Sequence, residues 1–378
     1  MSQSFLYPLL QCIHLIAHGN GVKGLLAQER PIHQHFGEFR MKKSLIALAV
    51  LASAGAAMAQ SSVTIYGRLD AGVGTRDKGT GSDSKMFTGG DVGLTTPRLG
   101  FRGSEDLGGG LKVNFQLEQR IDLDSGAQQP TKANGVDVPG FKGAATVGLA
   151  GGFGQIRAGR MLTVYDDVRA LSNSRNLFDS NGLTPTASVF KTISGTKTKN
   201  ADYSSRFNSQ LRYDMPVMGG VYGGVSYAFE QTSGKGDKLV GFMLGYKAGG
   251  LDVALGYQDE KTKNKYTTLA GAYDMGSFAV SAGYNRRNGT LTADGDDDEY
   301  NLGVEVPVGA FKLSAGYAAG KTKNVTSTAK SSGFGVGGTY SLSKRTRLYA
   351  GYSKVEEKTA GKVTGKDTIL SLGVRHDF

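Results

Sequence analysis

Hydrophobic and polar residues alternate with a period of two along most of the chain from residue 63 onward. In the run LKVNFQLEQR, Leu111 and Val113 fall on one side, and Lys112 and Asn114 fall on the other. A β-strand has this pattern when one face meets apolar surroundings and the other meets water. The runs are ~9–11 residues long, which is the length that a tilted strand needs to cross a membrane. The pattern therefore predicts strands along nearly the whole of this region.

Short turns, most of them rich in glycine, join these strands in pairs. The first turn is DLGGG, after the strand at 98–102, and glycine supplies the positive φ that tight hairpins need. The strand pairs that flank the other six turns are 142–150 and 155–160, 207–215 and 221–231, 238–247 and 251–261, 266–273 and 278–287, 299–306 and 311–322, and 332–341 and 346–355. Seven short turns, with a first and a last strand that pair to close the sheet, imply sixteen strands.

Longer polar stretches lie between the hairpins and predict loops. Examples are RDKGTGSDSKMFTGGD, DSGAQQPTKANGVDVPG, RNGTLTADGDDDE and EEKTAGKVTGK. An even number of strands, with short turns at one rim and long loops at the other, is typical of outer-membrane barrels. In lipid no water satisfies free backbone N–H and C=O groups, so a spanning sheet must close on itself. We therefore expect an all-β fold, a 16-stranded antiparallel transmembrane β-barrel, rather than a soluble sandwich.

The start of the chain differs from the rest. Residues 41–59, MKKSLIALAVLASAGAAMA, have a cationic start, a short apolar run and a small-residue cleavage site, as a secretory signal peptide has. Such a peptide must be N-terminal to be read, so we interpret residues 1–40 as an extension from a mis-assigned start codon. Residues 60–378 then form the barrel domain. At the other end, the last predicted strand finishes with Phe378, as terminal strands of outer-membrane barrels do.

Composition excludes several kinds of chemistry. Removing residues 1–59 takes away five Lys and Arg and two acids, which leaves 39 against 31 and a net charge of +8. The remaining chain has no cysteine and one histidine, His376, so thiol chemistry and a histidine-based nucleophile have no support. Basic residues are interspersed with acids in an exported chain, so we expect no nucleic-acid partner. We expect no cofactor and no enzymatic activity.

Several runs together resemble one known family. They are SSVTIYGRLDAGVG, RLGFRGSEDLGGGLKVNFQLE, FGQIRAGR, YSLSKRTRLYAGY and the closing LGVRHDF. They resemble the trimeric general porins of beta-proteobacteria, within the Gram-negative porin family, over residues 60–378. The resemblance implies a homotrimer in the outer membrane and passive diffusion of small hydrophilic solutes, often with a preference for anions. It also implies contact with outer-membrane lipid and lipopolysaccharide.

One stretch lacks the strand pattern. Roughly forty residues between Gln155 and Arg206 show no alternation, and loops of that length within a compact domain are usually functional or disordered. The resemblance implies that this is the third extracellular loop, folded into the lumen to form a constriction. Its acids are Asp166, Asp167 and Asp179. We expect them to face a basic wall across the pore; alternatively, they cap turns or pin the loop to the wall.

The basic wall is predicted from the resemblance and from strand parity. Arg98 and Arg206 match wall arginines of the family, and Lys142 matches a further basic position. Gly143 and Ala144 stand where more arginine can occur, which weakens the expected anion selectivity. A charged side chain that faced lipid at mid-membrane would be destabilising by ~2–4 kcal/mol, so these side chains should face water. The complete predicted basic wall is Arg98, Arg206, Lys142, Arg157 and Arg120.

These observations favour an outer-membrane diffusion channel with anion preference. The alternatives are a substrate-specific channel, a plugged barrel that acts as an anchor or adhesin, and an outer-membrane enzyme. Sixteen strands enclose more lumen than side chains can fill, which favours a channel. The acidic run DGDDDE at 294–299 could hold a divalent cation, but it lacks the spacing of a known calcium loop. We interpret it as a solvated outer loop and expect no metal site.

Overall fold

A computed structural model describes most of the region that was predicted to form the barrel. The described residues are 62–79, 81–88, 93–128, 132–133, 136–137, 140–175, 206–229, 238–261, 264–289, 296–323 and 327–378. The chain divides into two compact units, Met1–Met58 and Ala59–Phe378, and every described residue lies in the second. The predicted extension 1–40, the predicted signal peptide 41–59 and Asp179 lie outside the described residues.

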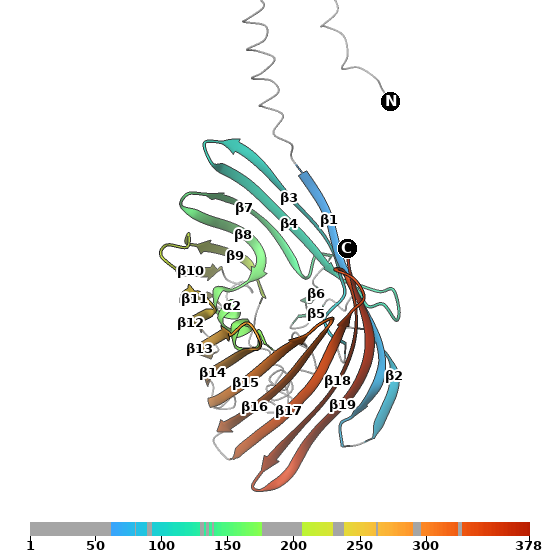
Figure 1. The fold of residues 1–378 in the computed structure, drawn as a ribbon. Coiled ribbons are helices and arrows are strands. Elements are labelled where there is room, and N and C mark those ends of the chain that lie inside the picture. Colours follow the sequence, from blue (N-terminus) through green and yellow to red (C-terminus); the bar gives the residue numbers. More distant parts are fainter. Residues whose placement is uncertain are drawn as a thin grey trace, which may run out of the picture. The chain divides into compact units, whose positions relative to one another are not determined.

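Sixteen long strands form one closed antiparallel sheet among the described residues (Figure 1). They are β1 (Ser62–Asp77), β3 (Arg98–Gly108), β4 (Leu111–Arg120), β7 (Ala144–Gly151), β8 (Gly154–Leu162), β9 (Arg206–Asp214), β10 (Val221–Ala228), β11 (Leu239–Ala248), β12 (Leu251–Glu260), β13 (Asn264–Asp274), β14 (Ala279–Gly289), β15 (Asp296–Val308), β16 (Phe311–Lys323), β17 (Thr328–Ser341), β18 (Thr346–Thr359) and β19 (Lys362–Asp377). Each pairs with its sequence neighbours among these sixteen, and β1 pairs with both β3 and β19. The predicted 16-stranded barrel is confirmed.

The seam between the first and last strands is closed by the C-terminal residue. The backbone N–H of Gly67 donates to the carbonyl of Phe378 at 3.0 Å, and the N–H of Phe378 donates back to Gly67 at 3.1 Å. A Cβ on Gly67 would overlap the Phe378 ring, so the glycine makes room for the aromatic side chain. Since an open edge in lipid leaves backbone groups unsatisfied, these bonds complete the barrel.

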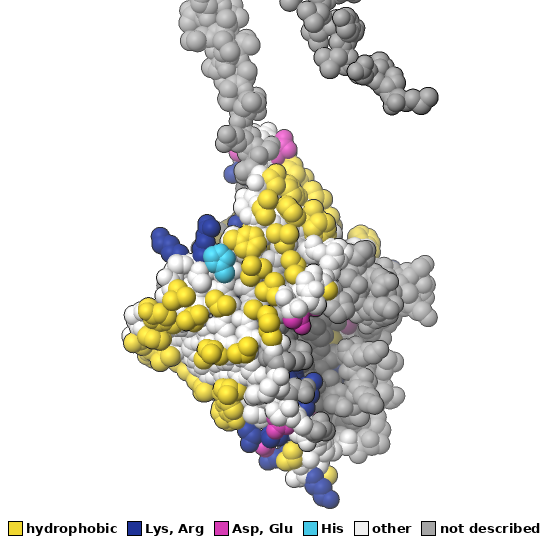
Figure 2. Space-filling model, turned by 90° about the vertical axis from the view of Figure 1, so that its right-hand side faces the viewer, with side chains coloured by type: hydrophobic (Ala, Val, Ile, Leu, Met, Phe, Trp, Pro, Cys, Tyr) yellow, Lys and Arg dark blue, Asp and Glu magenta, His cyan; other side chains and the backbone are white. Residues whose placement is uncertain are grey.

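The barrel wall is apolar outside and polar inside. Leu244 is 60% exposed and Leu269 is 58% exposed, whereas Gln258 and Glu299 are fully buried. Figure 2 shows hydrophobic side chains over the outer wall, with Lys and Arg side chains gathered toward its ends. A soluble sandwich would place the apolar face in its core. The exposed apolar face is instead the one that meets lipid.

All seven predicted short turns join strands in the structure, but several predicted loops are shorter than expected. Residues 356–366 form the hairpin of β18 and β19 around a two-residue turn at Ala360 and Gly361. Asp296–Glu299 of the acidic run belong to β15 and not to a loop. The stretch after β1 contains another strand, β2 (Ser82–Thr88), which pairs with the end of β1. Two-residue strands β5 (Lys132–Ala133) and β6 (Val136–Asp137) lie between β4 and β7.

The stretch after β8 begins with a helix, α2 (Val164–Ser172), where the sequence predicted no regular structure. Thr163 is its N-cap, in an extended conformation, and its hydroxyl accepts a hydrogen bond from the N–H of Asp166. Such a cap stabilises a helix by about 1 kcal/mol. The carboxylates of Asp166 and Asp167 in the first turn favour the positive end of the helix dipole.

Glycines on the inner face of the wall seat this helix. A Cβ on Gly256 of β12 would lie 3.2 Å from Val168, and one on Gly283 of β14 would overlap Ser172. Val168 packs with Ala254 of β12 and Ala270 of β13. Because the strands carry glycine and alanine under α2, the helix lies directly against the inner face of the barrel (Figure 1).

Candidate functional site

A row of arginines crosses the first three long strands of the barrel. Arg98 of β3 is directly opposite Arg68 of β1 on one side and Arg120 of β4 on the other. Residues opposite each other in a sheet point to the same face. The Tyr66 hydroxyl and the Glu118 carboxylate, in the next row, bond on that same inner face. The register therefore places three guanidinium groups side by side on the lumen wall.

The carboxylate of Glu118 lies next to this row. Its Oε2 is 3.5 Å from Arg98 Nη1, and its Oε1 is 3.2 Å from Arg120 Nη2. Tyr66 donates to Oε2 at 3.2 Å, and Gln116 donates to the Tyr66 hydroxyl at 2.7 Å. Glu118 is only 6% exposed. One acid is therefore shared between two arginines and is held in place by a hydrogen-bond chain.

Three more cations converge at the start of β7. Arg206 Nε donates to the carbonyl of Gly143 at 2.8 Å, and Arg160 Nε donates to the carbonyl of Lys142 at 2.9 Å. Burial lowers the pKa of Lys142, and the positive charges of Arg120, Arg160 and Arg206 lower it further. That mutual effect means that these four basic groups are close enough to repel one another. We call Arg98, Arg120, Lys142, Arg160 and Arg206 the basic cluster.

Steric crowding by Glu118 explains the glycine at position 143. A Cβ there would overlap Oε1 of Glu118, so no larger residue fits without moving that carboxylate. The space that a side chain at position 143 would fill is therefore taken by the carboxylate that pairs with Arg98 and Arg120. Arg160 of β8 adds a cation beside Lys142 that the sequence did not single out.

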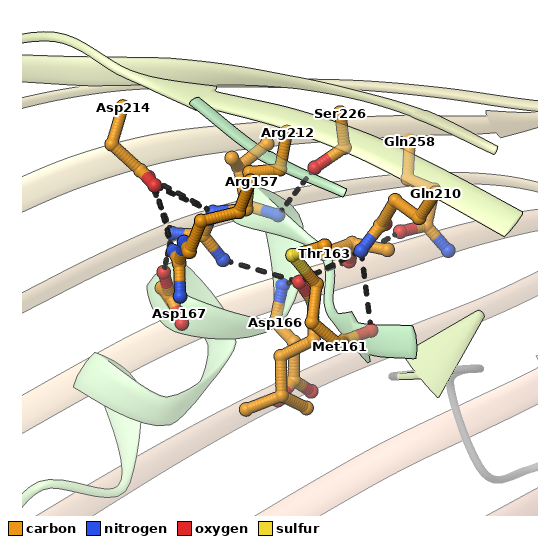
Figure 3. A network of polar contacts seen from close by, with 12 residues as sticks. Arg157, Met161, Thr163, Asp166, Asp167, Gln210, Arg212, Asp214, Ser226 and Gln258 are labelled. Carbon is orange, nitrogen blue, oxygen red and sulfur yellow. Dashed lines mark hydrogen bonds and ion pairs between the residues drawn. The ribbon is translucent and has the colours of Figure 1, made fainter. Parts of the chain in front are cut away.

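A second charged group ties α2 to the wall (Figure 3). Arg212 of β9 is 5% exposed, donates from Nη2 to Asp167 of the helix, and donates from Nε to Asp214 at 2.9 Å. Arg157 of β8 also donates to Asp214, at 2.7 Å. Asp167 therefore contacts Arg212 and not the basic cluster. Arg157 likewise lies with this second group, paired to Asp214.

The other predicted acid of the helix has a partner on its own element. Asp166 Oδ1 is 2.8 Å from Arg169 Nη2, and the Asp166 residue is 6% exposed. Further hydrogen bonds tie the helix to the wall, from Thr163 to Gln258, from Val164 to Ser226 and from Asn301 to Ser172. The first and last turns of α2 are thereby both fixed to strands of the barrel.

Arg157 and a further arginine, Arg102, line a polar pocket of about 340 Å³ on the inner wall. Arg102 lies with its guanidinium 5.1 Å from the centre of the Tyr66 ring, and Arg157 is at the other side of the pocket. Gln116 and Thr146 lie between them in one cross-strand row. Positive groups therefore continue along the wall from the basic cluster toward the short turns.

Neither metal ligands nor a membrane helix were found in the part of the chain that is described. Within those residues, no three His, Cys, Asp or Glu side chains lie together in a way that could hold a metal ion. Likewise, no helix there is both long and apolar enough to cross a membrane.

Comparison with known proteins gives the family directly. The model of the Gram-negative porin family matches residues 44–360. The chain is 35% identical to outer membrane porin protein 32 of Delftia acidovorans, over 89% of this chain and 100% of that protein. It is 29% identical to major outer membrane protein P.IB of Neisseria lactamica, with the same coverage.

A solved structure agrees in fold. The anion-selective porin from Comamonas acidovorans superimposes with a TM-score of 0.69 and 29% identity, over 84% of this chain and 100% of that one. A closed sheet of sixteen strands, an apolar outer wall and a charged lumen accompany this match. The chain belongs to the Gram-negative porin family, whose members are diffusion channels of the outer membrane.

Proposed function

We propose that the channel prefers anions and that the basic cluster filters charge as small hydrophilic solutes diffuse through. The observation that carries this proposal is the convergence of five cationic side chains on one part of the wall, beside the carboxylates of Glu118, which pairs with Arg98 and Arg120, and of Asp122, which acts on Lys142. Fixed charge in a narrow pore raises the local concentration of the opposite ion. The anion-selective porin from Comamonas acidovorans, similar over its whole length, supports the same preference.

The stretch that begins with α2 is proposed to narrow the pore opposite this cluster. The helix lies against the inner face of β10 to β15, and its hydrogen bonds to the wall support an inward path. In this proposal Asp167 pins the stretch to Arg212, and Asp166 stabilises the helix through Arg169. Asp179 is proposed to contribute negative charge across the pore from the cluster.

The remaining parts of the proposal concern assembly and partners. The channel acts as a homotrimer in contact with outer-membrane lipid and lipopolysaccharide, carries no cofactor and performs no catalysis. Residues 41–59 direct export and are then removed.

Reversal potentials in a salt gradient test the filter. Arg98→Ser combined with Arg206→Ser removes two charges of the cluster, and we expect the anion-to-cation permeability ratio to fall severalfold. Lys344→Ser combined with Arg345→Ser, at a short turn outside the pore, removes equal charge as the control. An unchanged ratio in the first variant would refute the assignment.

Single-channel recordings separate the alternatives. Stable conductance steps in groups of three support a trimeric channel, whereas a silent bilayer with folded protein supports a plugged barrel. A panel of organic anions then distinguishes a general channel from a substrate-specific one, since only the latter saturates at low concentrations of one solute.

A further inference from the structure

The polar pocket between Arg102 and Arg157 lies on two neighbouring rows of the inner wall. In the first row, Gln116 of β4 is directly opposite Arg102 of β3 and Thr146 of β7. In the second row, Gly148 of β7 is opposite Arg157 of β8. A Cβ on Gly148 would lie 2.7 Å from Cγ of Arg157, so the glycine makes room for the arginine side chain beside the pocket.

Five neutral polar side chains of this pocket have no hydrogen-bond partner among the described residues. They are Thr64, Ser104, Asn114, Thr146 and Gln155. Elsewhere on the inner wall polar side chains bond to one another, as Thr268 does to Asn285 at 2.5 Å and Gln258 does to Glu260 at 3.1 Å. The pocket therefore leaves hydroxyl and amide groups available to a solute.

The two arginines of the pocket differ in how far their charge is offset. Arg102 stacks on the Tyr66 ring and forms no ion pair within the described residues. Arg157 pairs with Asp214 at 2.7 Å (Figure 3), but its Nε is buried without a hydrogen-bond partner among those residues. A buried donor without an acceptor is destabilising by ~1–3 kcal/mol. The pocket thus offers one uncompensated positive charge and one donor that needs an oxygen.

We propose that this pocket binds a sugar acid, a small solute with one carboxylate and several hydroxyl groups. The carboxylate lies on Arg102, because a guanidinium donates two parallel hydrogen bonds to a carboxylate. The hydroxyls bond to Asn114, Thr146 and Nε of Arg157. The pocket volume of about 340 Å³ is at the lower end of the range of about 300–1,000 Å³ that small-molecule sites occupy.

The pocket is separate from the basic cluster. Arg102 is four residues beyond Arg98 on β3, about 13 Å along the strand toward the short turns. Short turns of outer-membrane barrels face the periplasm, so a solute that enters from outside passes the basic cluster first and then reaches the pocket. The inference rests on the proposed function and adds a class of solute to it, since the basic cluster distinguishes solutes only by charge.

Saturation-transfer NMR of the detergent-solubilised protein, titrated with gluconate, tests the pocket. Hexanoate has the carboxylate and the chain length of gluconate without the hydroxyls, and sorbitol has the hydroxyls without the charge. We expect gluconate to bind at least fivefold more tightly than either. Equal affinity for hexanoate or for sorbitol would overturn the proposal.

Arg102→Gln tests the charged half of the site. Because Arg102 has no acid as a partner in the described structure, its removal leaves no carboxylate unpaired, and we expect at least a fivefold weaker affinity for gluconate. Lys312→Gln removes the same charge near another short turn and should bind gluconate as the unaltered protein does. Equal weakening by both variants would show that the field of the whole lumen attracts gluconate, and the pocket would then have no role.

Asn114→Leu combined with Thr146→Val tests the hydroxyl half at constant charge. This variant should weaken gluconate binding at least threefold and leave hexanoate binding unchanged. Undiminished binding of gluconate, or an equal loss for both solutes, would contradict the proposed contacts.

Reversal potentials in a salt gradient keep this test separate from the proposed function. A channel without anion preference would contradict the charge filter, while binding of gluconate through Arg102 still stood. An anion-selective channel that binds gluconate no better than hexanoate would contradict the pocket alone.

Discussion

Replacing Glu118 should raise the anion selectivity of the pore, whereas replacing the arginines of the basic cluster should lower it. Its carboxylate lies 3.5 Å from Arg98 and 3.2 Å from Arg120 on the inner wall. Glu118→Gln removes the negative charge but keeps an oxygen that can accept the hydrogen bond of Tyr66. The net charge of the wall rises by one, so we expect a larger anion-to-cation permeability ratio.

The size of this change follows from Coulomb energies. A unit charge about 8 Å from a permeating ion in a water-like dielectric changes the energy of that ion by about 0.5 kcal/mol. The added positive charge stabilises an anion and destabilises a cation by the same energy. Without screening, the permeability ratio therefore changes by about fivefold. At ~0.1 M salt the Debye length is ~10 Å, which reduces the change to about twofold.

The assay is the reversal potential of single channels in a potassium chloride gradient, at low and at high salt. A double variant, Glu118→Gln with Arg120→Gln, restores the original net charge and should return the ratio to that of the unaltered protein. The double variant also removes the repulsion between Arg98 and Arg120 that the single variant leaves without an acid to offset it. It should therefore fold even if the single variant does not. A ratio that falls in the single variant, or that does not return in the double variant, would refute the reasoning.

Three other predictions concern the basic cluster and the helix. Because the pKa of Lys142 lies below its ordinary value of 10.5, the lysine loses its charge as pH rises toward that value. The anion preference of the unaltered channel should therefore weaken at alkaline pH, whereas that of Lys142→Arg should persist. Equal dependence of the permeability ratio on pH in the two proteins would contradict this. Asp167→Asn removes the ionic tie to Arg212, worth about 1 kcal/mol for a partly exposed pair, and should increase open-channel current noise; unchanged noise would show that the tie does not hold the helix. Gly283→Leu would displace Ser172 by more than about 1 Å to restore normal contact distances and should change single-channel conductance, so an unaltered conductance would count against the seating of α2.

The strands and short turns could be predicted because each follows from a local rule. Alternation of period two marks a wall with lipid on one side and water on the other, and glycine marks a tight turn. The alternation of period two disappears where both faces of a strand meet water. Residues 356–366 and Asp296–Glu299 are mostly polar on both faces, so their sequence predicts loops, although they continue β15, β18 and β19 beyond the apolar band.

The helix α2 is not predicted by strand alternation, which this stretch lacks. The signal was present: Thr163 is followed three residues later by Asp166, and apolar residues recur at Val164, Val168 and Leu171. That combination of an N-cap with helical spacing indicates the start of a helix. The length of the stretch and the absence of alternation predict a loop instead.

The partners of the site residues depend on register, which the sequence does not give. Strand parity predicts that Arg98 and Arg206 point inward, but it does not predict that Glu118 pairs with both Arg98 and Arg120. A slip of one residue in strand pairing exchanges the two faces. For the same reason the contact between Asp167 and Arg212 emerged only from the folded chain.

The preference of the pore for anions is tested most directly by the reversal potential of the unaltered channel in a potassium chloride gradient at neutral pH. With Arg98, Arg120, Lys142, Arg160 and Arg206 on one part of the wall, we expect the potential to have the sign that indicates chloride permeation in excess of potassium. A potential of zero, or of the opposite sign, would contradict the proposed filter.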